Sequence, residues 1–172
     1  MTAPGPQSAI ALEAANAEAT RAIGRAIGGQ LRPGDLVTLD GPLGAGKTTL
    51  VRGLALGAGS HDDVSSPTFV LSQEYEIEGR PGLDALVHID AYRLSPGELP
   101  SIGWEGDAAE LRRGALVVVE WASRIAEALP DDRLAVALEH ADPGRRMTLQ
   151  ARGGLRERLP ALQNTLAPWV AT

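Results

Sequence analysis

The chain has 172 residues and a formal net charge of −6 at pH 7, and it contains no cysteine. This length fits one domain, and the lack of cysteine excludes disulfides and cysteine-ligated zinc. The acidic charge disfavours a protein that grips nucleic acid unaided, because such proteins present a basic surface to the phosphates.

The N-terminal part of the sequence predicts a tail, a strand and a helix. Residues 1–8 are small, polar and proline-bearing, so we expect a disordered tail without the features of a signal peptide, followed by a single domain over residues 9–172. A short strand is expected at 9–13. Asn16 is suited to cap a helix over residues 17–28, which carries apolar residues on one face.

The most specific motif follows, where residues 41–49 read GPLGAGKTT. This is the P-loop pattern Gly-x4-Gly-Lys-Thr, in which backbone N–H groups surround the α- and β-phosphates of a nucleotide. An apolar run at 35–40 predicts the strand before it, and residues 48–56 predict the helix after it, whose N-terminus would face the anion. The residues expected to bind the nucleotide are Gly41, Gly44, Ala45, Gly46, Lys47, Thr48 and Thr49.

Lys47 is the only lysine in a chain with fifteen arginines. A compact ammonium can reach the β- and γ-phosphates, whereas a planar guanidinium is too wide to fold back into that cradle. The sequence therefore predicts that the chain binds a nucleoside triphosphate. The alternative is a glycine-rich turn that binds nothing.

The middle of the chain predicts a loop and a hairpin. Residues 57–66 are rich in glycine and aspartate and are expected to form a loop. Strands are predicted at 68–77 and 85–90, and the polar, glycine-bearing residues 78–82 between them indicate an antiparallel hairpin.

Short helices and one very apolar strand come next. Ser95 followed by Pro96 suits a helix start, and a short helix is expected at 107–113. Residues 115–120 (ALVVVE) form the most apolar run, so this strand should be buried in the centre of the sheet. Another short helix is expected at 123–129.

The C-terminal part predicts a second hairpin and an amphipathic helix. Strands are expected at 133–139 and 145–151, joined by a turn at 142–144. Apolar residues then recur at helical spacing and should face the core; they are Leu155, Leu159, Leu162, Leu166 and Trp169. The whole order predicts an α/β fold of three layers, the P-loop NTPase fold, with a mixed, mostly parallel central sheet and antiparallel hairpin additions.

Neither a membrane span nor a basic patch is evident in the sequence. No stretch approaches the roughly 20 apolar residues that cross a bilayer, so we expect a cytoplasmic protein with no membrane partner. The basic doublets are Arg112-Arg113 and Arg145-Arg146, which we interpret as solvated ends of strands or helices.

Two apolar strands end in carboxylates, Asp90 and Glu120. In α/β sheets, ligands bind at the carboxyl ends of parallel strands. P-loop enzymes hold Mg²⁺ with the hydroxyl of the loop, here Thr48, and with an acid at such a strand end. Each carboxylate could instead merely cap a helix.

Two further residues lie close to these segments. Thr68 follows the stiff Ser66-Pro67 step and could reach the metal or the γ-phosphate, or it could belong to an ordinary turn into a strand. Trp121 comes directly after Glu120 and could line the site or fill the core.

Four segments, GPLGAGKTT, SSPTFVLSQEY, HIDAYRL and VVVEW, occur in this order at compatible spacing. Together they resemble the TsaE family, the small bacterial P-loop ATPases of the machinery that makes threonylcarbamoyladenosine at position 37 of tRNA. The resemblance covers residues 9–151. The chain departs from the family pattern at Ala122 and Ser123, where the family has Pro-Glu, which bears on the turn after Trp121.

The resemblance implies an ATPase that binds the partner proteins TsaB and TsaD, meets tRNA only through them, and resets their complex between turnovers. It should hydrolyse ATP slowly alone and faster with the partners. The expected cofactors are ATP and Mg²⁺, with Thr48 and Glu120 holding the metal. Asp90 is the candidate for orienting the attacking water and Thr68 for sensing the γ-phosphate, while Lys47 contacts the phosphates. The division of roles between Asp90 and Glu120 stays open.

Two other functions remain open from the sequence. A small-molecule P-loop kinase would use the same phosphate chemistry but needs an acceptor pocket, and an ATP-gated interaction module would bind nucleotide without depending on its turnover. A GTPase with an Asn-Lys-x-Asp motif is excluded, because that motif needs a second lysine.

Overall fold

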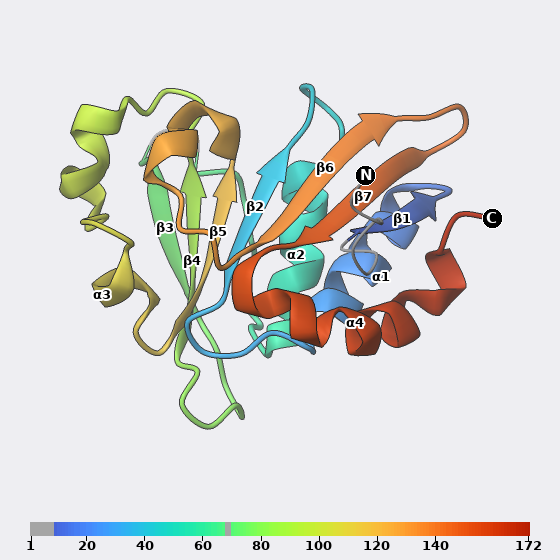
Figure 1. The fold of residues 1–172 in the computed structure, drawn as a ribbon, viewed down its shortest axis with the longest axis horizontal. Coiled ribbons are helices and arrows are strands. Elements are labelled where there is room, and N and C mark those ends of the chain that lie inside the picture. The colour runs from blue at the N-terminus through green and yellow to red at the C-terminus, as the bar shows by residue number, and fades with distance from the viewer. Residues whose placement is uncertain (1–8, 68–69) are drawn as a thin grey trace, which may run out of the picture.

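The computed structural model describes residues 9–67 and 70–172 (Figure 1). The expected tail at 1–8 and the candidate Thr68 lie outside the described residues.

One seven-stranded sheet runs through the molecule in the order β1-β7-β6-β2-β5-β4-β3. The strands β6, β2, β5 and β4 are parallel neighbours, whereas β7, β1 and β3 add antiparallel strands at the two sides. This arrangement confirms the predicted α/β class with a mixed sheet and hairpin additions. The strand bounds are β1 Ala9–Ala14, β2 Leu36–Asp40, β3 Ser72–Glu76, β4 Ala85–Asp90, β5 Ala115–Glu120, β6 Leu134–His140 and β7 Arg145–Ala151.

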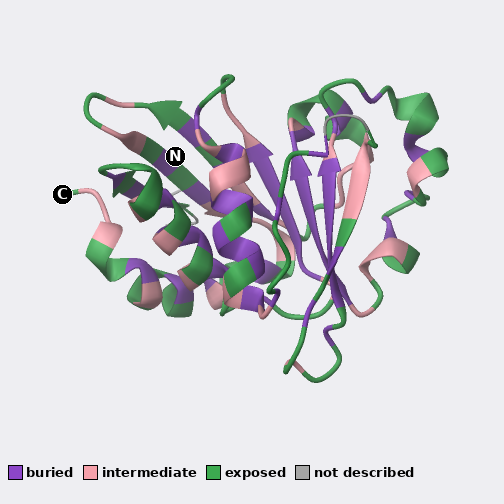
Figure 2. Cartoon of the chain, turned by 180° about the vertical axis from the view of Figure 1, so that it is seen from behind, coloured by how far each residue is buried: buried purple, intermediate pink, exposed green. Residues whose placement is uncertain are grey.

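Helices cover both faces of this sheet and bury two apolar clusters against it (Figures 1 and 2). One face carries α1 (Ala17–Gly28), α2 (Lys47–Ala58) and α4 (Leu159–Leu166). The other carries α3 (Ala109–Arg112) with two 3₁₀ helices. The 3₁₀ helices of the chain are η1 Pro96–Ile102, η2 Ala122–Ala128, η3 Gly153–Arg158 and η4 Ala167–Trp169.

Four expected elements differ from the observed ones in extent or type. Among the described residues, β3 covers Ser72–Glu76, and the expected start at residue 68 lies outside them. Leu71 has a left-handed backbone (φ 61°), which is not a strand conformation. The terminal helix is divided into η3, α4 and η4, since Pro160 and Pro168 lack the N–H that would continue a helix. Its leucine stripe is nevertheless buried in the core, as expected. The helix expected at 107–113 is the shorter α3, of four residues, and the one expected at 123–129 is the 3₁₀ helix η2.

The P-loop helix α2 is fixed to α1 by glycines on both helices. A Cβ built on Gly53 would overlap the carbonyl O of Arg21, and one built on Gly57 would overlap that of Arg25. Gly24 and Gly28 are equally close to the backbone of α2. Because the two backbones touch, α2 is held rigidly at the point where it leaves the P-loop.

Gly53→Ala should therefore lower the free energy of unfolding by about 1–3 kcal/mol, the usual cost of overpacking. It should do so although alanine favours a helix by about 1 kcal/mol over glycine. Thermal and urea unfolding measure the change, with Gly97→Ala as the matched control, since an added Cβ there meets nothing within 4 Å. A Gly53→Ala protein as stable as wild type would show that the helices can separate freely.

No helix within residues 9–67 and 70–172 is long and apolar enough to span a membrane.

Candidate functional site

The P-loop links the end of β2 to the start of α2, at the edge where β4 and β5 also end. Gly44 (φ 75°) and Gly46 (φ 102°) have left-handed backbones, which side-chain-bearing residues adopt rarely. A Cβ on Gly41 would overlap the carbonyl O of Leu138 in β6. The loop thus needs glycine at all three positions, and Ala45 is buried beneath it.

The side chain of Lys47 is folded into this loop. Its Nζ donates to the carbonyl O of Gly41 at 2.6 Å and to that of Pro42 at 3.0 Å. The residue is only 6% exposed. Burial lowers the pKa of the Lys47 ammonium, while the nearby carboxylates Glu120, Asp40 and Asp90 act in the opposite direction.

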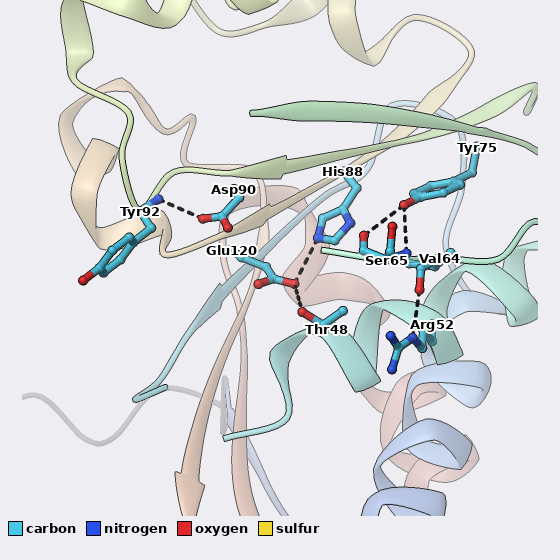
Figure 3. Close-up of polar contacts among 9 residues, drawn as sticks. All are labelled: Thr48, Arg52, Val64, Ser65, Tyr75, His88, Asp90, Tyr92 and Glu120. Carbon is cyan, nitrogen blue, oxygen red and sulfur yellow. Dashed lines mark hydrogen bonds and ion pairs between the residues drawn. The ribbon is translucent and has the colours of Figure 1, made fainter. Parts of the chain in front are cut away.

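Glu120, the last residue of β5, contacts the P-loop helix directly (Figure 3). Its Oε1 accepts a hydrogen bond from Thr48 Oγ1 at 3.0 Å and lies 3.0 Å from His88 Nε2. Both Glu120 and His88 are buried, at 3% and 0% exposure. A carboxylate can only accept, so the His88 tautomer that donates to Glu120 is the one with its hydrogen on Nε2. Its Nδ1 has no partner within the described part of the chain.

Asp90 ends β4 directly beside Glu120, because the two residues are paired in the parallel register of β4 and β5. Its Oδ1 accepts from the backbone N–H of Tyr92 at 2.9 Å. The two strand-end acids that the sequence pointed to therefore lie next to each other at the carboxyl edge of the sheet.

Trp121 lies in the wall of the site and packs over Lys47. Lys47 Nζ is 3.9 Å from the centroid of its ring, a distance typical of a cation–π contact. The Trp121 and Tyr92 rings are 4.9 Å apart at 55°. Trp121 has a left-handed backbone (φ 58°), which is uncommon outside glycine and often marks a functional site.

A cavity of about 450 Å³ opens at this place, within the usual size range for small-molecule sites. Predicted residues in its wall are Gly44, Gly46, Lys47, Thr48, Thr49, Asp90, Glu120 and Trp121. Leu43, Ser66 and Tyr92 complete it. Gly41 and Ala45 belong to the loop but not to the cavity wall, and Thr68 lies outside the described residues.

A second, smaller cavity of about 280 Å³ also borders the P-loop. Thr49 and Gly44 of the loop face it, together with Asn16 and Thr20 of the α1 start and with Arg145. Arg145 also donates to the carbonyl O of Gly44 at 3.1 Å. Arg145 is the first residue of β7 and is half-buried, so it is a strand end as expected. Its side chain is not simply solvated, however, because the β6–β7 hairpin brings it onto the P-loop.

Sequence reasoning assigned no role to His88, Tyr92 or Arg145. Each contacts a site residue that is distant in the sequence: His88 contacts Glu120, Tyr92 contacts Trp121, and Arg145 contacts Gly44. The HIDAYRL segment held the signal for the first two, since it places His88 and Tyr92 two residues on either side of Asp90.

Comparisons with known proteins give a consistent result. Residues 14–148 match the model of the family "Threonylcarbamoyl adenosine biosynthesis protein TsaE". The tRNA threonylcarbamoyladenosine biosynthesis protein TsaE of Mycobacterium leprae is 43% identical over 129 residues, covering 71% of this chain and 77% of the relative. That of Bacillus subtilis is 39% identical over 146 residues, covering 84% and 87%. The crystal structure of YdiB from Bacillus subtilis superposes with a TM-score of 0.69 at 33% identity, covering 93% of this chain and 95% of YdiB.

Proposed function

Because this chain belongs to the TsaE family of tRNA threonylcarbamoyladenosine biosynthesis, a P-loop ATPase family, we propose that it is the ATP-hydrolysing component of that machinery. In this proposal it binds the TsaB–TsaD pair and resets it between rounds of modification. The contact between Thr48 and Glu120 beside the only lysine is the observation that carries the ATPase assignment.

The two cavities provide room for the two halves of ATP. Gly44, Gly46 and Thr49 of the P-loop line both cavities, so the phosphates would lie on the loop backbone, with the terminal phosphate toward Glu120 and the nucleoside toward Asn16 and Arg145. An ammonium has three N–H donors. Two of those on Lys47 meet loop carbonyls, which leaves the third for a phosphate oxygen.

The donor set fits Mg²⁺, a hard cation that prefers oxygen ligands and is often shared between one carboxylate and the phosphates of a nucleotide. Thr48 Oγ1 and the Glu120 carboxylate would hold it. When bound, it would neutralise charge on the β- and γ-phosphates. His88 keeps the Glu120 carboxylate turned toward Thr48, and Asp90 at the neighbouring strand end would orient the attacking water.

The partner part of the proposal is supported by the rim of the larger cavity. Leu43 and Tyr92 stand there 85% and 50% exposed, and a bound protein would cover them. A partner that completes the transition-state contacts can raise the rate of a P-loop protein by roughly 10³- to 10⁵-fold. We therefore expect slow hydrolysis alone and a large increase with TsaB–TsaD.

Single-turnover hydrolysis of ATP, with and without the purified pair, tests this function. A rate that rises only with the pair present supports it. Phosphate transfer to a small molecule would instead indicate a kinase. Tight ATP binding with no hydrolysis under either condition would indicate an ATP-gated interaction module.

A further inference from the structure

The segment of residues 59–66 lies along the outer edge of β3, the last strand of the sheet on that side. Glu78 N–H donates to the carbonyl O of Gly59 at 3.1 Å, and Glu76 N–H donates to Asp62 Oδ2 at 2.9 Å. Closer to the nucleotide-sized cavity, the segment contacts the side chain of a β3 residue. The segment thus covers an open sheet edge without forming a strand there.

This residue is Tyr75, whose hydroxyl forms two hydrogen bonds with the backbone of a single residue of the segment (Figure 3). The Tyr75 hydroxyl donates to the carbonyl O of Ser65 at 3.0 Å and accepts from the backbone N–H of Ser65 at 3.2 Å. Tyr75 is 3% exposed, so its ring is anchored in the core while its oxygen reaches the loop. Ser66, the following residue, lines the same cavity as Lys47 and Glu120.

A second contact joins the segment to the P-loop helix. Arg52 Nε donates to the carbonyl O of Val64 at 2.8 Å. Arg52 is four residues after Thr48 in α2, so the two side chains leave the same face of the helix. The helix that begins at the phosphate site therefore also holds the loop that closes one wall of that site.

We propose that Tyr75 and Arg52 are positioning residues, which fix the backbone of Val64 and Ser65 so that Ser66 stands at the terminal-phosphate side of the cavity. This inference rests on the proposed ATPase function and deepens it. Beyond the backbone bond of Gly59 at its start, the segment is attached through side chains and not by a strand ladder, so residues 62–66 can loosen without disturbing the sheet. If the segment loosens, the γ-phosphate should be positioned less well for hydrolysis, while the P-loop contacts of the α- and β-phosphates stay intact.

The test uses Tyr75→Phe, which removes only the hydroxyl, and Arg52→Gln, which removes the guanidinium from an exposed helix position. Arg113→Gln is the matched control, since this side chain is 76% exposed and pairs with Glu110, three residues before it. Hydrogen exchange of residues 60–66 should accelerate about tenfold in Tyr75→Phe, the effect of losing one or two hydrogen bonds. It should also accelerate in Arg52→Gln and stay unchanged in Arg113→Gln.

In the same variants, the rate of ATP hydrolysis should change more than the affinity for ADP. We expect the hydrolysis rate to fall about tenfold, while the affinity for ADP, which lacks the γ-phosphate, changes less than about twofold. Unfolding curves check that each variant is folded. If Tyr75→Phe failed to fold, Arg52→Gln would still decide the question, because Arg52 lies at the surface.

Unchanged exchange at 60–66, or equal losses of ADP and ATP affinity, would overturn the positioning role. Failure of the wild-type protein to bind or hydrolyse ATP would instead contradict the proposed function, so the two failures are distinguishable.

Discussion

Replacing Lys47 by alanine should weaken ATP binding by at least about 10²-fold, the loss expected when one or two charge-assisted hydrogen bonds to phosphate are removed. The chain offers no substitute, since Lys47 is its only lysine. The buried ammonium is already aimed into the loop by the carbonyls of Gly41 and Pro42. Isothermal titration with ATP and Mg²⁺ measures the change.

Lys47→Arg is the matched control, because it keeps the charge and changes the shape. A guanidinium is planar and wider than an ammonium, and the space between the loop carbonyls and the Trp121 ring is narrow. We therefore expect Lys47→Arg to bind ATP almost as poorly as Lys47→Ala. Wild-type affinity in Lys47→Ala would place the nucleotide elsewhere.

Replacing Glu120 should leave much of the ATP affinity intact and reduce hydrolysis by about 10²-fold or more, as for other groups that stabilise charge in the transition state. Glu120 contacts Thr48 at the start of α2, whereas the P-loop backbone that surrounds the phosphates does not depend on it. Glu120→Gln preserves shape and a polar partner for Thr48 and His88, and Glu120→Ala removes both. Single-turnover hydrolysis and titration with ATP separate the two effects.

A circular dichroism spectrum decides whether this acid serves the fold or the chemistry. If Glu120→Gln lost its secondary structure, the carboxylate would be a structural strand end. If it folded normally and hydrolysed ATP like wild type, Asp90 would be the more important of the two acids.

Local sequence patterns were sufficient where the signal lies within a few residues. Asn16 caps α1 by accepting from Ala19 N–H, as its residue type and position predicted. The run at Ala115–Glu120 is buried along its whole length, as expected for a central strand. The P-loop lies between a strand and a helix because each of the three parts has its own local pattern.

The contacts that build the site could not be predicted in this way, because they join distant residues. Glu120 and Thr48 are 72 residues apart, and His88 and Glu120 are 32 apart. Both contacts depend on β5 lying between β2 and β4, and no short pattern specifies this strand order. Arg145 reaches the P-loop for a similar reason, through the placement of a hairpin that had only its own turn as a signal.

Backbone conformations at the ends of the strands could not be predicted from the sequence either. Leu71 and Trp121 are apolar residues in left-handed conformations, which their residue types disfavour. The fold imposes both, and each lies beside a candidate acid: the carbonyl O of Leu71, just before β3, accepts from Asp90 N–H, and Trp121 follows Glu120 at the end of β5.

Under the proposed function, ATP hydrolysis at this P-loop allows the tRNA-modifying complex to act repeatedly. The most direct measurement is a reconstitution with tRNA, threonylcarbamoyl-adenylate, the TsaB–TsaD pair and either wild-type or Glu120→Gln protein, in which modified tRNA is counted per complex. We expect many rounds with wild type and a single round with Glu120→Gln. Equal multiple turnover with both proteins, with hydrolysis lost in Glu120→Gln, would contradict it.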